Sequence, residues 1–397
     1  MLIQGYSQEI VYFDDKLIRK IAEDMVNFST NVEKGEDVLI FLDPGGRQLA
    51  LELAKLSLKK GARVYYLIQD RELNAEIIKG SSKLNIARFF SFDNIKFFEA
   101  EVTFLIRCPR NEFVYEEIEK EKMIEFNQAM KPAVIDFRVN YSRWCLIYLP
   151  TQMEAKIEGL KYEDYVKIFF QSCQRDWVRV KKVQEKLCQI LDKGKELILI
   201  ANSKNKDPKK RTRLEMSIEG MDFINSTIEA NYPGSEVYSS PIKNSVNGQV
   251  FAEGVYSYSG KKMEDIYLKF ENGKIVEASA KKGENNLNDI LDSDEGAKYI
   301  GEIALGTNYK LKRRLFNPLL NEKVGGSFHF ALGRSYRDEY KDGKLKRIYN
   351  GNDSLIHWDI TILMHKKYGG GEVIVDGKTI QKDGLFVLKE LQELNHL

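Results

Sequence analysis

The chain has 397 residues, a length beyond the usual size of a single hydrophobic core, so we expect two domains. Its 61 basic and 59 acidic residues leave a net charge of +2, too small to argue for nucleic acid or an anionic membrane as partner. The four cysteines form no C-x-x-C pair, which argues against a disulfide framework and favours a reducing cytoplasm. We expect neither secretion nor a membrane span, because no apolar run reaches about 18 residues.

The N-terminal part has the pattern of a β-α-β unit. An apolar strand at 38–42 is followed by a turn, a helix with spaced leucines that ends at Gly61, and a second apolar strand at 64–68. Near-continuous apolar strands are typical of a parallel sheet covered on both faces. Further strands are predicted at 104–107, 133–139 and 146–149. These elements predict an open, mostly parallel α/β domain.

The turn between the first strand and helix, Asp43-Pro44-Gly45-Gly46, stands where a doubly wound fold binds phosphate. It has neither the G-x-G-x-x-G nor the G-x-x-x-x-G-K-[ST] spacing, and Pro44 removes a backbone N–H that could bind an anion. We therefore expect an ordinary strand-to-helix turn and no nucleotide cofactor.

Residues 161–192 are mostly helical in pattern, and we expect them to bridge an N-terminal domain (1–185) and a C-terminal domain (186–397). The basic run at 206–213 is short and lacks interleaved aromatic residues, which favours a solvated loop over a nucleic-acid patch. Beyond residue 231 the segments are short and alternating, and Asn272-Gly273 predicts a tight hairpin. The C-terminal domain is therefore predicted to be mixed α+β and rich in strands.

Two of the four histidines lie in strand-like segments of this domain. In "GSFHFALGRSY" phenylalanines flank His329, so on a strand the rings and the imidazole point to opposite faces. In "NDSLIHWDI" the same period places His357 and Asp359 on one face and Trp358 on the other. The spacing alone leaves two interpretations open: a divalent-metal site with a bridging carboxylate, or a hydrogen-bonded structural pair, which is the commoner case.

Two glutamates add to the metal interpretation. Glu302 follows a glycine after a predicted helix in "DEGAKYIGEIALGTN", and Glu236 follows a Pro-Gly turn in "NYPGSEVYSSP". Taken singly, each glutamate is explained equally well by an ordinary solvated position on the surface.

The whole chain resembles the thermophilic aminopeptidase family of cocatalytic metallopeptidases, the aminopeptidase T, AmpS and PepS type. The runs "YPGSEVY", "YIGEIALGTN", "GGSFHFALGRSY" and "NDSLIHWD" are similar to that family's metal-binding blocks in order and spacing. The N-terminal half is similar to the family only in its general sequence pattern. The resemblance implies that five side chains ligate metal: Glu236, Glu302, His329, His357 and Asp359. It also implies that Tyr336 is a further ligand or a transition-state contact.

Three carboxylates and two imidazoles are too many donors for one zinc ion with an open position, but they suit two ions that share a carboxylate and a water. Zinc, cobalt, manganese and magnesium all remain open. The expected enzyme is a cytoplasmic aminopeptidase that removes N-terminal residues from short peptides. The resemblance also implies a homodimer. The alternatives are a metal-dependent amidase acting on another substrate and a non-catalytic binding protein.

The chain departs from the family pattern at two positions. Asn321 stands where an aspartate is expected, and Arg337 follows Tyr336 where a proline is usual. A long charged loop then leads to Asn352. Glu322 and Glu253 are candidates for the general base, but spacing alone assigns the role to neither.

Overall fold

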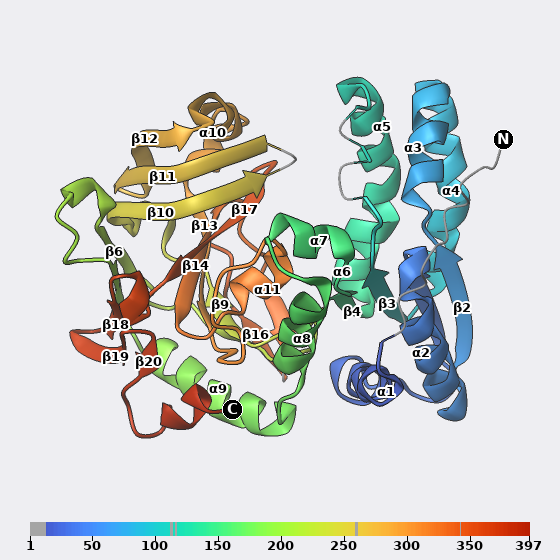
Figure 1. Ribbon diagram of the computed structural model, residues 1–397, viewed down its shortest axis with the longest axis horizontal. Coiled ribbons are helices and arrows are strands. Elements are labelled where there is room, and N and C mark those ends of the chain that lie inside the picture. The colour runs from blue at the N-terminus through green and yellow to red at the C-terminus, as the bar shows by residue number, and fades with distance from the viewer. Residues whose placement is uncertain (1–12, 112–113, 116, 259–260, 342) are drawn as a thin grey trace. The chain divides into compact units, whose positions relative to one another are not determined.

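The computed structural model describes residues 13–111, 114–115, 117–258, 261–341 and 343–397 (Figure 1). The chain divides into two compact units. Unit 1 runs to Cys173 and adds Ile228–Pro233, and unit 2 comprises Gln174–Thr227 and Gly234–Leu397. The boundary predicted after residue 185 falls inside helix α9 (Trp177–Leu191), which belongs to unit 2.

Unit 1 is built on a five-stranded sheet in the order β2-β1-β3-β4-β8, with every pairing parallel. Its strands are β1 (Asp37–Leu42), β2 (Arg63–Ile68), β3 (Val102–Arg107), β4 (Arg143–Tyr148) and β8 (Asn231–Tyr232). The predicted open parallel α/β domain is confirmed. Strand β8 joins this sheet from a distant part of the chain, which the sequence analysis did not foresee.

The helices of unit 1 precede or follow these strands along the chain (Figure 1). They are α1 (Asp15–Asp24), α2 (Arg47–Lys59), α3 (Arg71–Gly80), α4 (Lys83–Glu99), α5 (Lys120–Met130), α6 (Arg138–Tyr141), α7 (Gln152–Ile157) and α8 (Tyr162–Cys173). Two π-helical turns, Met25–Ser29 and Lys131–Phe137, extend α1 and α5.

The strand predicted at 133–139 is wrong, because this segment is the π-helical turn Lys131–Phe137 followed by α6. Ala133 and Val134 are buried in a cluster with Phe97 and Leu105. A short apolar run has the same composition whether it is a buried strand or a buried helical turn, and periodicity does not separate the two.

Unit 2 contains two larger antiparallel sheets and a small one. The eight-stranded sheet has the order β12 (Lys274–Lys282), β11 (Lys261–Glu271), β10 (Asn247–Tyr258), β6 (Thr212–Ser217), β5 (Glu196–Ala201), β18 (Gly371–Val375), β19 (Lys378–Lys382) and β20 (Leu385–Phe386). The five-stranded sheet has the order β17 (His357–Leu363), β14 (Ser327–Gly333), β13 (Ile300–Gly306), β9 (Glu236–Ser239) and β7 (Ile224–Ser226). A hairpin of β15 (Glu339–Lys341) and β16 (Lys344–Lys346), together with helices α9, α10 (Glu284–Leu291) and α11 (Pro318–Glu322), completes the unit.

The hairpin predicted at Asn272-Gly273 is confirmed, since these two residues join β11 to β12. Both have positive φ, 51° and 85°, which is the backbone geometry that a two-residue hairpin turn requires. The predicted strand-rich mixed domain is likewise confirmed.

One hydrophobic cluster joins the two larger sheets of unit 2. It contains buried residues from both sheets and from α9 and α10. Phe270 of β11 meets Phe330 of β14 edge to face, with ring centroids 6.4 Å apart. Each sheet thus buries one face in a common core, and the far face of the five-stranded sheet is left for other side chains.

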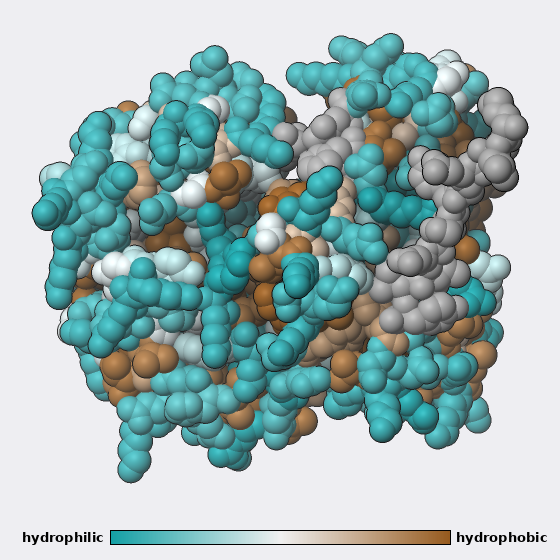
Figure 2. Space-filling model, viewed as in Figure 1, coloured by the Kyte–Doolittle hydropathy of each residue, from teal (hydrophilic) through white to brown (hydrophobic). Residues whose placement is uncertain are grey.

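The face of the molecule seen in Figure 2 is mainly hydrophilic, with smaller apolar areas between charged and polar side chains. Among the described residues, every helix is too short or too polar to cross a bilayer.

Candidate metal centre

The five predicted ligands lie on four neighbouring strands of the five-stranded sheet. Ala331 of β14 pairs with Glu302 of β13 on one side and with Asp359 of β17 on the other, so these two carboxylates share a face. His329 lies two residues before Ala331, and His357 two residues before Asp359. Period-two alternation therefore puts both imidazoles on that same face.

The fourth strand brings in Glu236, the first residue of β9. It pairs with Gly306, which lies four residues beyond Glu302 on β13 and hence on the same face. The opposite face carries Phe328, Phe330 and Trp358, all buried in the core of unit 2. The alternation predicted for both histidine segments is therefore found in the structure.

His329 lies among the carboxylates. Its Nε2 atom is 3.5 Å from Glu302 Oε1, 3.7 Å from Glu236 Oε2 and 4.0 Å from Asp359 Oδ1. His357 Nε2 is 3.1 Å from Glu302 Oε2 and 3.6 Å from Asp359 Oδ1. Glu302 therefore faces a different imidazole with each oxygen, as a carboxylate shared between two ions would.

Burial and opposite charge act against each other in this group. Burial lowers the pKa of each imidazole, but the carboxylates outweigh it and raise the pKa of His329 to about 9 and that of His357 to about 10. Burial raises the pKa of Glu302, yet its hydrogen bonds to both histidines hold that pKa at about 2. Burial also raises the pKa of Asp359, partly offset by His357. Without a metal ion, the positive charge of the protonated imidazoles offsets part of the negative charge of the carboxylates.

Two features of the donor atoms fit divalent metal ions. Glu236 Oε2 is buried without a hydrogen-bond partner in the part of the chain that the structure describes, an arrangement that costs free energy and that a cation on this oxygen would relieve. His357 Nδ1 lies 2.7 Å from the backbone oxygen of Arg334, so a proton on Nδ1 leaves the lone pair of Nε2 facing Glu302. Glu302, His357 and Asp359 each supply one donor atom within 4.8 Å of the others.

Tyr336 follows β14 and lies beside this group. Its ring packs between those of Tyr238 and His357, with centroids 5.3 Å away in each case. The residue is 44% exposed. Surrounding protein atoms and the charge of Glu302 raise the pKa of Tyr336 well above its usual value, so its hydroxyl stays protonated and can donate a hydrogen bond.

Glu322 and Lys323, at the end of α11, complete the site. Lys323 is fully buried, and its Nζ atom donates to Glu236 Oε1 at 2.5 Å and to Glu322 Oε2 at 2.9 Å. Burial lowers the pKa of Lys323, but the two glutamates raise it above its usual value. Burial raises the pKa of Glu322 to about 7, although Lys323 opposes the shift.

Spacing in the sequence does not choose between Glu322 and Glu253 as the general base, and the structure separates them. Glu253 is exposed on β10, in the other sheet, whereas Glu322 belongs to the acidic cluster. The two departures from the family pattern are also located. Arg337 forms an ion pair with Asp353 at 2.8 Å. Asn321 has a buried side-chain oxygen without a hydrogen-bond partner among the described residues.

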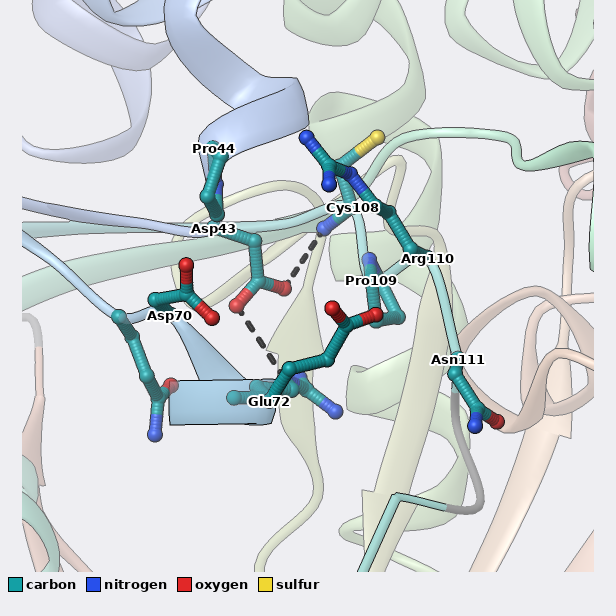
Figure 3. A pocket seen from close by; sticks show the side chains of 10 residues that line it. Asp43, Pro44, Asp70, Glu72, Cys108, Pro109, Arg110 and Asn111 are labelled. Carbon is teal, nitrogen blue, oxygen red and sulfur yellow. Dashed lines mark hydrogen bonds and ion pairs between the residues drawn. The ribbon is translucent and has the colours of Figure 1, made fainter. Parts of the chain in front are cut away.

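A separate pocket in unit 1 lies at the Asp43-Pro44-Gly45-Gly46 turn (Figure 3). Asp43 accepts hydrogen bonds from the backbone N–H of Cys108 at 2.9 Å and from Arg71 Nε at 3.2 Å. A Cβ on Gly46 would lie 2.5 Å from the side chain of Ile106, and one on Gly45 would lie 2.7 Å from Cys108 Sγ. Close packing against the end of β3 thus accounts for both glycines.

Metal affinity is expected to rise with pH. A metal ion must displace the protons that raised pKa values of about 9 and about 10 keep on His329 and His357 at neutral pH. Below about pH 9 the apparent association constant of an ion should increase by roughly one decade per pH unit for each imidazole that it ligates, and it should level off above about pH 10. Competition against a chelator of known affinity between pH 6 and 10 measures this slope. An affinity independent of pH from 7 to 9 would mean that the imidazoles are not the ligands.

The fold and the donor set together define a metalloprotein with a centre rich in carboxylates and containing two histidines. The thermophilic metalloprotease (M29) family matches residues 14–385. The chain therefore belongs to that family and is a metallopeptidase, as the four sequence blocks predict.

Individual relatives agree with this assignment. Aminopeptidase AmpS of Bacillus subtilis (strain 168) is 25% identical over 92% of this chain and 95% of its own, and aminopeptidase 2 of Geobacillus stearothermophilus is 25% identical over 93% and 95%. Aminopeptidase T of Thermus aquaticus is 36% identical, but over only 37% of this chain and 36% of its own.

Among solved structures, wild-type AmpT from Thermus thermophilus has a TM-score of 0.76 at 22% identity, covering 94% of this chain and 99% of that one. The 2,5-dihydroxypyridine dioxygenase of Pseudomonas putida KT2440 has a TM-score of 0.56 at 13% identity, covering 96% and 100%. Both likenesses concern the fold alone, and the second is to a protein of different chemistry.

Proposed function

We propose that the protein is a two-metal aminopeptidase that removes N-terminal residues from short peptides. The supporting observation is the convergence of three carboxylates and two imidazoles from four adjacent strands on one face of a sheet. The relatives that align along most of the chain are aminopeptidases, which favours N-terminal cleavage. A cytoplasmic homodimer loaded with zinc, cobalt, manganese or magnesium is part of this proposal.

The ligands in this proposal are the five side chains that meet on the sheet: Glu236, Glu302, His329, His357 and Asp359. Two divalent ions held there would supply Lewis acidity and a water of lowered pKa. Glu302 lies against both imidazoles and is the best placed to be shared. Tyr336 donates a hydrogen bond from its hydroxyl to the oxyanion that develops when the carbonyl carbon becomes tetrahedral.

Glu322 acts as the general base in this scheme. Its carboxylate takes a proton from the attacking water and returns it to the leaving amine, roles that suit a group with a pKa near neutrality. Lys323 Nζ donates a hydrogen bond to Glu322 Oε2 at 2.9 Å and so holds this carboxylate in place. The acid limb of the rate profile should lie at or below pH 7, because added cations stabilise the ionised carboxylate.

Glu322→Gln is expected to lower kcat by about 10²–10⁴-fold at saturating metal, because the amide cannot accept the proton. Glu253→Gln is the matched control, since it removes an exposed carboxylate from the neighbouring sheet. Steady-state rates with metal analysis of each variant measure the effect. Equal rates for wild type and Glu322→Gln would exclude Glu322 as the base.

The substrate class is tested by comparing aminoacyl p-nitroanilides and short peptides with their N-acetylated counterparts. We expect chelator-sensitive release of the first residue from free-amine substrates and none from the blocked ones. Cleavage of both kinds would favour the metal-dependent amidase instead. Tight metal binding without any hydrolysis would favour the non-catalytic binding protein.

A further inference from the structure

Lys323 is an unusual residue to find beside a metal centre. It is the only lysine among the buried residues of the described chain, and it is fully buried. A buried ammonium is costly unless it is paired and hydrogen-bonded. Here its Nζ atom lies between Glu236 Oε1 at 2.5 Å and Glu322 Oε2 at 2.9 Å. The position therefore places a permanent positive charge within the acidic cluster.

This contact makes the two oxygens of Glu236 differ in their hydrogen bonding. Oε1 is held by the ammonium, whereas Oε2 is buried, has no hydrogen-bond partner among the described residues, and faces His329 Nε2 at 3.7 Å. Glu236 can thus offer a cation only one free oxygen, and any cation on it shares the carboxylate with Lys323. The charge of that carboxylate is already partly neutralised.

The other side of the cluster differs in this respect. Glu302, His357 and Asp359 bring three donor atoms within 4.8 Å of one another. Asp359 Oδ1 is 3.6 Å from His357 and 4.0 Å from His329, whereas the ammonium of Lys323 is hydrogen-bonded to Glu236 and Glu322. The electrostatic attraction for a divalent ion is consequently greater on this side than beside Lys323.

This inference rests on the proposed two-metal function. We propose that Lys323 is a positioning residue that makes the two metal positions unequal in affinity. It fixes Glu236 for single-oxygen ligation and weakens the position formed by Glu236 and His329 relative to that of Glu302, His357 and Asp359. The position of Glu302, His357 and Asp359 is filled at lower metal concentration, and the position of Glu236 and His329 exchanges its ion more readily.

The test is stepwise addition of Co²⁺ to metal-stripped full-length protein, followed by calorimetry and by the visible absorption of bound cobalt. Wild type should bind two ions with dissociation constants at least about tenfold apart, the difference expected for one extra charge a few ångströms away. Two equally tight ions would overturn the inference while leaving the two-metal function intact. A total of one ion or none would instead overturn the proposed function.

Lys323→Met keeps the unbranched, flexible shape of the side chain without its terminal nitrogen and so removes its charge. The second dissociation constant should fall by about tenfold, while the melting temperature of the metal-free protein drops, because two buried carboxylates lose their partner. A purely structural role predicts that stability and metal affinity fall together, so a weaker second ion would overturn the proposal. Lys323→Arg should restore the unequal binding, and the exposed Lys344→Met is the control. If neither Lys323 variant folds, the wild-type constants still decide.

Discussion

Replacing Glu302 with glutamine is expected to abolish binding of both metal ions at micromolar metal and to lower kcat/KM by at least about 10³-fold. Glu302 is the side chain that faces both imidazoles, at 3.5 Å from His329 and 3.1 Å from His357. Glutamine has nearly the same shape but no negative charge, and it cannot give an anionic oxygen to each ion. Metal analysis after gel filtration and steady-state assays of the same preparation measure the two effects.

The control is Glu277→Gln, an exposed carboxylate on β12 that pairs with Lys269 at 3.3 Å. It should keep wild-type metal content and rate, because surface ion pairs contribute little. A Glu302→Gln protein that still carries two ions per chain would show that the shared ligand lies elsewhere in the cluster.

Tyr336→Phe is expected to keep both metal ions and to lose about 10²–10³-fold in kcat, the usual effect of removing one hydrogen bond to an oxyanion. The ring would remain packed between Tyr238 and His357, since only the hydroxyl is deleted. The loss should appear in kcat more than in KM, because the contact forms as charge develops on the oxygen.

Tyr340→Phe is the matched control for this variant. Tyr340 is 76% exposed on β15, and its hydroxyl donates a hydrogen bond to the backbone oxygen of Gly343 at 3.0 Å. Loss of metal in Tyr336→Phe, with Tyr340→Phe unaffected, would make Tyr336 a required ligand rather than a transition-state contact.

Local patterns in the sequence predicted the parts of the site that lie on single strands. His357 and Asp359 share a face because strand residues two apart do so, and the same rule separates His329 from the phenylalanines beside it. The hairpin at Asn272-Gly273 was predictable for a similar reason, since its turn geometry depends on two adjacent residues.

Contacts between distant segments were not predictable from such patterns. Glu236 and Glu302 entered the ligand set only through the resemblance of their blocks, because the pairing of β9 with β13 joins segments about 70 residues apart. No local signal distinguishes Lys323 from a surface lysine, and its burial follows from the packing of α11. The entry of β8 into the parallel sheet of unit 1 is likewise a long-range pairing.

Anomalous diffraction from crystals grown with Zn²⁺ or Co²⁺, recorded on both sides of the metal absorption edge, shows directly how many metal ions the protein binds and where they lie. A two-metal centre predicts two anomalous peaks per chain on one face of the five-stranded sheet, both in contact with Glu302, one beside Glu236 and His329 and the other beside His357 and Asp359. A single peak, or peaks away from this face, would contradict it.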